Sequence, residues 1–359
     1  LFIFIKSILS FYNYKAFLKI LQQEKKSFVV IELNSFHGEI LTPWHHCLKE
    51  LDSNNKILFL VSPEIYDENP FFDNTYDVVK IDRNWVLFLI NHGFLSKYKK
   101  VIFNSDYVYE RPFGGVEFLY KIIKKKYINN ALFISHNINL TTEYKGSTPI
   151  DKIIVLAEFI AKQTKTNYFF PKIGGKIITQ QDKLSNFDKL KKIVVVGNMN
   201  HAAKDYEGLL AALKKIEKKD STFSIDVVGK VSKKLPKDNF IKYHDRLSFV
   251  DLYDLLSESH YILFLLKKAE GYNFRSTNLT GSFLLSLNFK LIPVVEGSFL
   301  EFYSLNKDNA IVYDHDDIYA SLISIIEQDK DSYIKMISSL EDLSLKLHQV
   351  SLNDVSRLL

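Results

Sequence analysis

The stretch Asn278-Leu-Thr-Gly-Ser-Phe-Leu-Leu-Ser-Leu-Asn-Phe-Lys-Leu-Ile-Pro-Val-Val295 predicts a helix followed by a short buried strand. Thr280, Gly281 and Ser282 come directly before the apolar run of the helix, and residues 292–295 form the strand. The first N–H groups of a helix lack partners and carry a partial positive charge, and glycine lets an anion approach the backbone. The helix is therefore interpreted either as a phosphate-binding element or as an ordinary N-capped core helix.

The same alternation of strands and helices extends from this stretch in both directions. The predicted strands are short and apolar, without regular polar alternation, which indicates parallel sheets covered by helices on both faces. They are residues 28–33, 56–61, 77–81, 100–104, 131–135, 152–156, 192–197, 223–229, 240–243, 261–266, 292–295 and 310–313. Helices are predicted within residues 38–51, 85–95, 113–126, 205–219 and 249–257, and from residue 318 onward.

The length of 359 residues suits two domains of roughly 150 residues each. Residues 168–192 carry Pro171, Gly174, Gly175 and a polar run, as an interdomain connection does. We therefore expect Rossmann-like, doubly wound α/β domains at residues 27–185 and 190–345, facing each other across a cleft, with a further helix at residues 346–359. Ligands in such folds bind beyond the carboxyl ends of the strands.

Composition narrows the class of protein. Hydrophobic residues make up 47% of the chain and there are 13 Gly and 8 Pro, which is typical of an ordered globular protein. The single cysteine, Cys47, excludes a disulfide framework and favours a reducing, cytoplasmic location. The net charge of +5 is spread over lysine clusters that are typical of solvated surfaces, and no nucleic-acid-binding motif is present, so no nucleic-acid partner is predicted.

Residues 1–26 are basic and aromatic, with five lysines and one acid, Glu24. Lysines interrupt the segment too early for a membrane-spanning helix, and no signal-peptide cleavage site is present. Two interpretations remain, a helix lying on an anionic membrane surface and a helix packed on the first domain.

Two loops of the first domain carry candidate site residues. Ser35, His37 and Gly38 follow the first strand and form a candidate acceptor-side loop that contacts a bound sugar. His136 follows the strand at 131–135, where a histidine can act as a general base or contact a reacting hydroxyl. The alternative for each histidine is an exposed or turn-capping side chain.

The second domain has candidate ligand-binding residues after several of its strands. Gly197 allows a tight turn and Lys204 precedes a helix, a combination that complements a diphosphate. Gly229 and Lys230 are placed to border a nucleoside. Glu270 and Arg275 follow the strand at 261–266 and are candidates to hold sugar hydroxyls and a phosphate.

Several other sites lack their required parts. No G-x-G-x-x-G follows a strand, and the P-loop and G-x-S-x-G motifs are missing, so dinucleotide, NTPase and hydrolase functions are not supported. Asp314-His-Asp-Asp317 has ligands for a divalent ion, but a turn at a helix start is favoured because Asp prefers helix N-termini. No metal site and no cofactor are predicted.

These residues together resemble the donor-binding domain of GT-B glycosyltransferases, especially the retaining GT4 family, over about residues 190–300. The resemblance is carried by Val196-Gly-Asn198 with residues 204–213, by residues 226–229, by 252–259 leading into 261–266, by Glu270-Gly-Tyr272 and by 280–295. The first domain is similar in outline, through His136-Asn137 and residues 151–156.

The resemblance implies that Glu270 contacts the donor sugar and serves with His136 in catalysis. It also implies that Lys204 and the helix start at Thr280, Gly281 and Ser282 bind the donor diphosphate together with Gly197, and that no metal ion is needed. Two positions depart from the family pattern. Asn198 stands at the diphosphate loop where an arginine is usual, and Asn278 replaces the second glutamate of the E-x7-E pattern, which puts ribose recognition in doubt. Arg275 is a candidate to replace the missing cation.

The predicted function is transfer of a sugar from a nucleotide-diphosphate donor to a hydroxyl of a glycan, lipid-linked or protein acceptor. The expected setting is bacterial-type surface polysaccharide or glycoconjugate synthesis, in the cytoplasm or peripherally on the inner face of the membrane. Two alternatives remain, a nucleotide-sugar 2-epimerase and a non-catalytic glycosyltransferase-like binding subunit. Asn198 and Asn278 favour the binding subunit.

Overall fold

The computed structural model describes residues 11–22, 27–34, 37–68, 75–110, 115–119, 129–136, 149–172, 178–197, 204–216, 222–229, 239–266, 279–314 and 317–359. The chain forms two compact units. Unit 1 consists of Leu1–Gly175 with His348–Leu359, and unit 2 is Lys176–Leu347.

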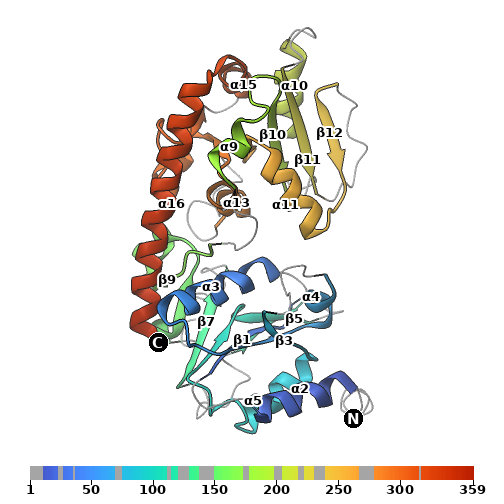
Figure 1. Ribbon diagram of the computed structural model, residues 1–359, viewed down its shortest axis with the longest axis vertical. Coiled ribbons are helices and arrows are strands. Elements are labelled where there is room, and N and C mark those ends of the chain that lie inside the picture. The colour runs from blue at the N-terminus through green and yellow to red at the C-terminus, as the bar shows by residue number, and fades with distance from the viewer. Residues whose placement is uncertain are drawn as a thin grey trace. The chain divides into compact units, whose positions relative to one another are not determined.

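Unit 1 is built on a seven-stranded sheet in which all neighbouring strands are parallel (Figure 1). The strand order is β3-β2-β1-β4-β7-β8-β9, so the direction of winding reverses between β1 and β4. The strands are β1 (Phe28–Glu32), β2 (Ile57–Val61), β3 (Asp77–Lys80), β4 (Lys100–Phe103), β7 (Ala131–Ser135), β8 (Ile153–Val155) and β9 (Asn167–Tyr168). Every residue of β1, β2 and β7 is buried, which explains their largely apolar sequences.

Helices cover the sheet of unit 1 because each turns an apolar face toward it. They are α2 (Phe11–Gln22), α3 (Leu41–Leu51), α4 (Pro63–Glu68), α5 (Arg83–Asn91) and α8 (Glu158–Thr164). Ile20 of α2 is buried in the core with Val79 and Leu89. The side chain of Asn13 donates to the Asp82 carboxylate at 2.7 Å and accepts from the Asp82 N–H at 3.0 Å. Part of the basic N-terminal segment therefore packs on unit 1.

The helix predicted at residues 113–126 is wrong at its start. Residues Gly115–Phe118 form strand β6, which pairs antiparallel with β5 (Tyr107–Glu110), and residues 120–128 lie outside the described part of the chain. The two segments, Tyr-Val-Tyr-Glu and Gly-Val-Glu-Phe, carry the aromatic and β-branched residues that strands prefer. A short apolar run does not distinguish a strand from a helix, and the pairing partner decided the outcome.

Unit 2 contains a six-stranded sheet, also with parallel neighbours throughout, in the order β12-β11-β10-β13-β14-β15 (Figure 1). Numbered along the chain, this is the 3-2-1-4-5-6 order of a Rossmann sheet. The strands are β10 (Lys191–Val196), β11 (Phe223–Val228), β12 (Ile241–His244), β13 (Tyr261–Leu263), β14 (Ile292–Glu296) and β15 (Ile311–Tyr313). The predicted fold class of two Rossmann-like, doubly wound α/β domains is confirmed.

Several helices of unit 2 begin at side-chain caps that satisfy one of their first N–H groups. Asp205 accepts from the Gly208 N–H, Ser248 from Asp251 and Asp317 from Ala320. Asp317 thus starts a helix, as the favoured interpretation of residues 314–317 predicted. Within the described residues, no three His, Cys, Asp or Glu side chains gather as metal ligands. The helices are α9 (Gln180–Leu184), α10 (Tyr206–Lys215), α11 (Phe249–Glu258), α13 (Gly281–Phe289), α14 (Leu300–Tyr303), α15 (Ile318–Glu327) and α16 (Lys330–Leu358).

Helix α16 is continuous, and it contributes residues to both units, with the division at His348. Side chains in its last part accept hydrogen bonds from backbone N–H groups of unit 1 that follow β8. Ser351 Oγ accepts from the Phe170 N–H at 2.8 Å, and Asp354 accepts from the Tyr168 N–H at 3.2 Å. The helix predicted at residues 346–359 is this final part of α16.

Buried His260 makes unit 2 sensitive to acid. Its Nδ1 accepts from the Lys192 N–H and its Nε2 donates to the Lys183 carbonyl, both at 2.9 Å, so the ring is neutral. Burial lowers the pKa of His260 from 6.5 to about 4. Between these values the unfolded chain binds the extra proton, so stability falls as the pH drops from 6.5 toward 4, by about 3 kcal/mol. Urea unfolding is expected to show this loss in the wild type and a smaller one in His260→Gln. Equal pH dependence in the two proteins would contradict it.

Candidate functional site

The described candidate residues follow strands of the two sheets, and Lys204 lies where the winding direction of the unit 2 sheet reverses. In unit 1 the reversal lies between β1 and β4, and in unit 2 it lies between β10 and β13. At such a point the loops after the two strands diverge, which opens a crevice beyond their carboxyl ends.

Lys204 lies at the reversal point of unit 2. Its Nζ donates to the carbonyl of Val196 at 3.2 Å, at the end of β10, and to the carbonyl of Phe264 at 2.8 Å, just after β13. The neighbouring Asp205 N–H donates to the carbonyl of Leu265 at 2.9 Å. The ammonium therefore sits over the carboxyl ends of the two strands where winding reverses.

The backbone around Lys204 adopts unusual conformations. Leu265 has a φ of 54°, in the left-handed region that a leucine rarely occupies, and this ends β13 at Leu263 rather than at the predicted residue 266. Gly197 has a φ of 128°, which also favours glycine. A Cβ at Gly197 would lie 3.5 Å from Lys204 Cε, so the glycine turn lies directly against the lysine.

The charge on Lys204 is available to an anion. Burial lowers its pKa to about 8, which still leaves the amine largely protonated at neutral pH. Its two acceptors are carbonyl oxygens, and no carboxylate in the described part of the chain forms an ion pair with it. A positive charge held on neutral dipoles is suited to an incoming phosphate.

The start of α13 is the second predicted phosphate contact. Thr280 and Ser282 are buried, yet the Thr280 side chain does not cap the helix. The Thr280 N–H donates to the buried hydroxyl of Tyr303 at 3.3 Å. A Cβ built on Gly281 would meet no atom of the described residues within 4 Å, so these residues leave space at the first turn. Because α13 connects two parallel strands, β13 and β14, this first turn lies at the carboxyl edge of the sheet.

Gly229 ends β11 with a φ of 148°, and its N–H donates to the His244 carbonyl at 3.3 Å. Below this turn, His244 Nε2 lies 2.6 Å from an Asp226 carboxylate oxygen and ties β11 to β12. This pair was not found from the sequence. The other candidates, Ser35, Asn198, Lys230, Glu270 and Arg275, and also Asn278, lie outside the described residues.

In unit 1 the structure brings together two histidines that the sequence predicted separately. The rings of His37 and His136 stack with centroids 3.6 Å apart and planes 12° apart. His37 follows β1 in the left-handed conformation, with φ 66°, and leads into the single turn Gly38–Ile40. His136 directly follows β7.

Hydrogen bonding fixes the form of His136. Its Nε2 lies 2.7 Å from the carbonyl oxygen of Asn104. A carbonyl only accepts, so Nε2 carries the hydrogen and Nδ1 keeps its lone pair. Burial lowers the pKa of His136 well below its usual value, and the neighbouring His37 adds to this effect. The ring is therefore neutral, with an acceptor nitrogen for a hydroxyl proton.

Glu32 holds this arrangement together and was missed from the sequence. It is fully buried at the end of β1 and accepts from the Asn34 N–H at 2.8 Å, from Asn104 Nδ2 at 2.9 Å and from Ser105 Oγ at 2.7 Å. Asn104 Nδ2 also donates to the His37 carbonyl at 2.9 Å. The carboxylate thus joins the loop that carries His37 to the loop that holds His136. A lone acid in the apolar strand Phe28–Glu32 was the available signal.

The comparisons with known proteins agree on the fold. No protein-family model and no curated protein matches the sequence. A glycosyltransferase from Rickettsia africae is a structural match, with TM-score 0.57 and 13% identity over 94% of this chain and 98% of that one. The chain has the GT-B fold.

Two further GT-B structures match over nearly their full lengths. Anabaena HepE in complex with UDP and glucose has TM-score 0.57 and 9% identity over 93% of this chain and 99% of that one. Sucrose-phosphate synthase from Thermosynechococcus elongatus has TM-score 0.56 and 9% identity over 93% and 98%. The predicted resemblance to GT-B glycosyltransferases is confirmed for the fold.

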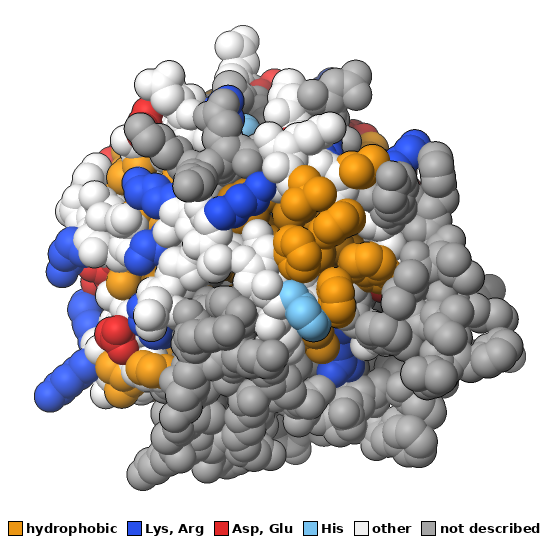
Figure 2. Space-filling model, turned by 90° about the horizontal axis from the view of Figure 1, so that it is seen from below, with side chains coloured by type: hydrophobic (Ala, Val, Ile, Leu, Met, Phe, Trp, Pro, Cys, Tyr) orange, Lys and Arg blue, Asp and Glu red, His pale blue; other side chains and the backbone are white. Residues whose placement is uncertain are grey.

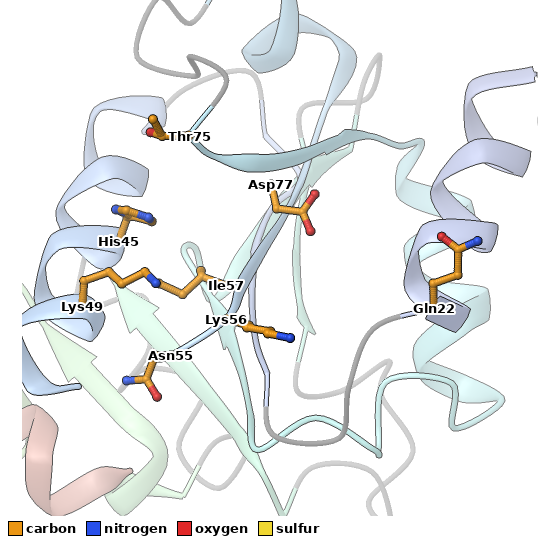
Figure 3. Close-up of a pocket in the computed structure, with 8 residues that line it drawn as sticks. All are labelled: Gln22, His45, Lys49, Asn55, Lys56, Ile57, Thr75 and Asp77. Carbon is orange, nitrogen blue, oxygen red and sulfur yellow. The ribbon is translucent and has the colours of Figure 1, made fainter. Parts of the chain in front are cut away.

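A pocket of about 410 Å³ opens on unit 1 (Figure 3). Ile57 and Asp77 in its wall are the first residues of β2 and β3, so it opens at the amino edge of the sheet of unit 1. The carboxyl edge carries the histidines, so this pocket is not part of the candidate site. It is lined by Gln22, His45, Lys49, Asn55, Lys56, Ile57, Thr75 and Asp77.

Proposed function

We propose that this protein is a glycosyltransferase that uses a nucleotide-diphosphate sugar. The observation that carries the proposal is the Lys204 ammonium, held by two backbone carbonyls over the carboxyl ends of β10 and β13. The open first turn of α13 lies at the same edge of the sheet, and a cation beside a helix start complements a diphosphate. The GT-B structures that match this chain are glycosyltransferases.

The proposed donor is a UDP-sugar. HepE, which shares the fold, was crystallised with UDP-glucose. Lys204, Arg275 and the start of α13 stabilise the leaving diphosphate, whose negative charge develops as the sugar is transferred. Glu270 binds hydroxyls of the donor sugar. This assignment follows the GT4 pattern, in which no metal ion takes part.

His136 is proposed to receive or orient the acceptor hydroxyl. Its Nδ1 lone pair is the available acceptor, and the stacked His37 restricts rotation of the ring. The acceptor is a hydroxyl of a glycan, a lipid-linked saccharide or a protein, in surface polysaccharide or glycoconjugate synthesis. The proposed location is the inner face of the cytoplasmic membrane. Among the described residues, no helix is long and apolar enough to cross a bilayer.

A nucleotide panel tests the proposal. The melting temperature is measured by thermal shift with UDP, UDP-sugars, GDP-sugars and CMP-sugars. The diphosphate ligands are expected to raise it, and UDP compounds are expected to raise it most. Ligand at a hundredfold excess over Kd adds about 2.7 kcal/mol to stability. CMP-sugars carry one phosphate and serve as the control.

A second candidate function, a non-catalytic binding subunit, is favoured by Asn198 and Asn278, which replace family residues. If no nucleotide changes the melting temperature, the glycosyltransferase proposal fails and the binding subunit remains. Isothermal calorimetry with UDP confirms any shift as direct binding. Release of UDP from a UDP-sugar in the presence of an acceptor then distinguishes the enzyme from the subunit.

A further inference from the structure

Aromatic and aliphatic side chains gather on the surface of unit 1 over α2, α5 and the turn after α5. Figure 2 shows hydrophobic side chains grouped beside a histidine on the face seen from below in Figure 1. Leu18 and Leu21 of α2 are 39% and 48% exposed, and the aromatic members are half-buried. We call the following set the aromatic patch: Phe17, Leu18, Leu21, Trp85, Phe88 and Phe94.

The rings of the aromatic patch pack on one another. The ring centroid of Phe17 lies 5.4 Å from that of Phe94 and 6.1 Å from that of Trp85. The ring centroids of Trp85 and Phe88 lie 5.5 Å apart. Phe88 also lies 4.1 Å from the exposed ring of His92. The helices thus present a continuous apolar surface made of stiff side chains.

Both helices already have a buried face. Val86, Leu89 and Ile90 of α5 fill the core, as does Ile20 of α2. Phe17, Trp85, Phe88 and Phe94 pack against the outer margin of this core and stay partly exposed. A surface helix normally turns polar residues outward, so partly exposed rings beside the exposed Leu18 and Leu21 mark an interaction surface.

Cations border the aromatic patch. Lys97 Nζ donates to the carbonyls of Ile20 and Leu21 at 2.5 and 3.2 Å, which fixes an ammonium at the end of α2. Lys15 is exposed on the same helix. Phosphate head groups complement such a border, while aromatic rings favour the boundary between head groups and acyl chains.

We propose that the aromatic patch inserts into the interface of an anionic phospholipid bilayer. This inference rests on the proposed function, which includes a location at the membrane. It names the surface of the protein that contacts the membrane. A second copy of the chain fits less well, because a two-fold contact through this surface would bring one lysine border against the other. An anionic bilayer supplies both the apolar layer and the opposite charge.

Vesicle binding by the full chain tests the inference. The protein is expected to co-sediment with vesicles of phosphatidylcholine mixed with phosphatidylglycerol, and less with phosphatidylcholine alone. Trp44 is fully buried, so the second tryptophan of the chain, Trp85, is the reporter. Its emission is expected to shift to shorter wavelength on binding, and brominated lipids are expected to quench it.

Paired substitutions supply the control. Leu18→Glu/Leu21→Glu is expected to weaken vesicle binding at least about tenfold, since each carboxylate would have to enter the interface. Val250→Glu/Leu345→Glu introduces the same charges at positions 52% and 61% exposed in unit 2 and is expected to bind as the wild type does. Equal losses in both pairs, no loss in the first pair, or no binding by the wild type would overturn the inference.

Two further measurements separate this inference from the others. Analytical ultracentrifugation that finds a dimer in the wild type and a monomer in Leu18→Glu/Leu21→Glu would assign the aromatic patch to a second copy and overturn the bilayer proposal. The UDP-induced thermal shift is expected to be unchanged in that variant. Vesicle binding without a UDP-induced rise in melting temperature would contradict the donor proposal alone. A UDP-induced rise without vesicle binding would contradict the bilayer inference alone.

Discussion

Lys204→Met is expected to eliminate most of the UDP-induced rise in melting temperature. The substitution removes the half-buried ammonium over the ends of β10 and β13. A hydrogen bond to a charged group contributes about 1.5–3 kcal/mol, so Kd should rise by roughly ten- to a hundredfold. The unliganded protein is also expected to lose about 1–3 kcal/mol, since the carbonyls of Val196 and Phe264 lose their donor. Thermal shift and isothermal calorimetry measure the two effects.

Lys183→Met is the matched control for Lys204→Met. Lys183 is a buried lysine whose Nζ likewise donates to two carbonyls, those of Leu256 and Ser259 at 2.9 and 2.6 Å. These carbonyls lie at the end of α11, so this lysine stabilises the fold without facing the carboxyl edge between β10 and β13. Lys183→Met is expected to lower stability and to keep the UDP shift. A full UDP shift in Lys204→Met would remove that lysine from the donor site.

Glu32→Ala is expected to destabilise unit 1 by about 3 kcal/mol or more and to remove most sugar transfer. It leaves three buried donors, from Asn34, Asn104 and Ser105, without their acceptor, at about 1–3 kcal/mol each. The loops that place His37 and His136 then lose their connection. Urea unfolding and initial rates measure the two effects.

Glu32→Gln separates a positioning role from a loss of folding. It keeps the size of the side chain and one acceptor oxygen, so the protein should fold, with the UDP-induced thermal shift retained because unit 2 is unchanged. The rate of sugar transfer is expected to fall because kcat is lower. The substitution displaces His37 and His136 but leaves donor binding unchanged. Wild-type kcat in Glu32→Gln would show that the Glu32 carboxylate does not position the catalytic loops.

The same pair of proteins tests the electrostatics of Glu32. Burial raises the pKa of Glu32 above its usual 4.5, and this outweighs the hydrogen bonds that favour the ionised form. The folded state therefore binds a proton more tightly than the unfolded state does. Protonated Glu32 contributes fully to the free energy of unfolding below pH 4.5, and this contribution is lost as the pH rises through the pKa that Glu32 has in the folded state. Urea unfolding should show wild-type stability falling with pH relative to Glu32→Gln. A rise would mean that the carboxylate is the stabilised form.

The sequence by itself determined the order and type of most elements. Strands such as Phe28–Glu32 and Lys191–Val196 are mostly apolar because helices cover both faces of a parallel sheet, and their charged residues lie at the strand ends, so composition alone identifies them. The same rule placed Gly197, Lys204 and Thr280 near one edge, since loops after parallel strands share an edge. The short strand Gly115–Phe118 was predicted as helix because its partner, Tyr107–Glu110, is not visible in a local pattern.

Tertiary structure alone decided which side chains meet. His37 and His136 are far apart in the chain, and their stacking depends on the positions of β1 and β7 on either side of β4 in the sheet. The role of Glu32 depends on donors that β4 and its following loop bring to it. The aromatic patch likewise exists because α2 and α5 pack side by side, which brings rings of both helices together at the margin of the core. Local periodicity reports which residues favour burial, whereas contacts between distant segments are set by strand order and packing.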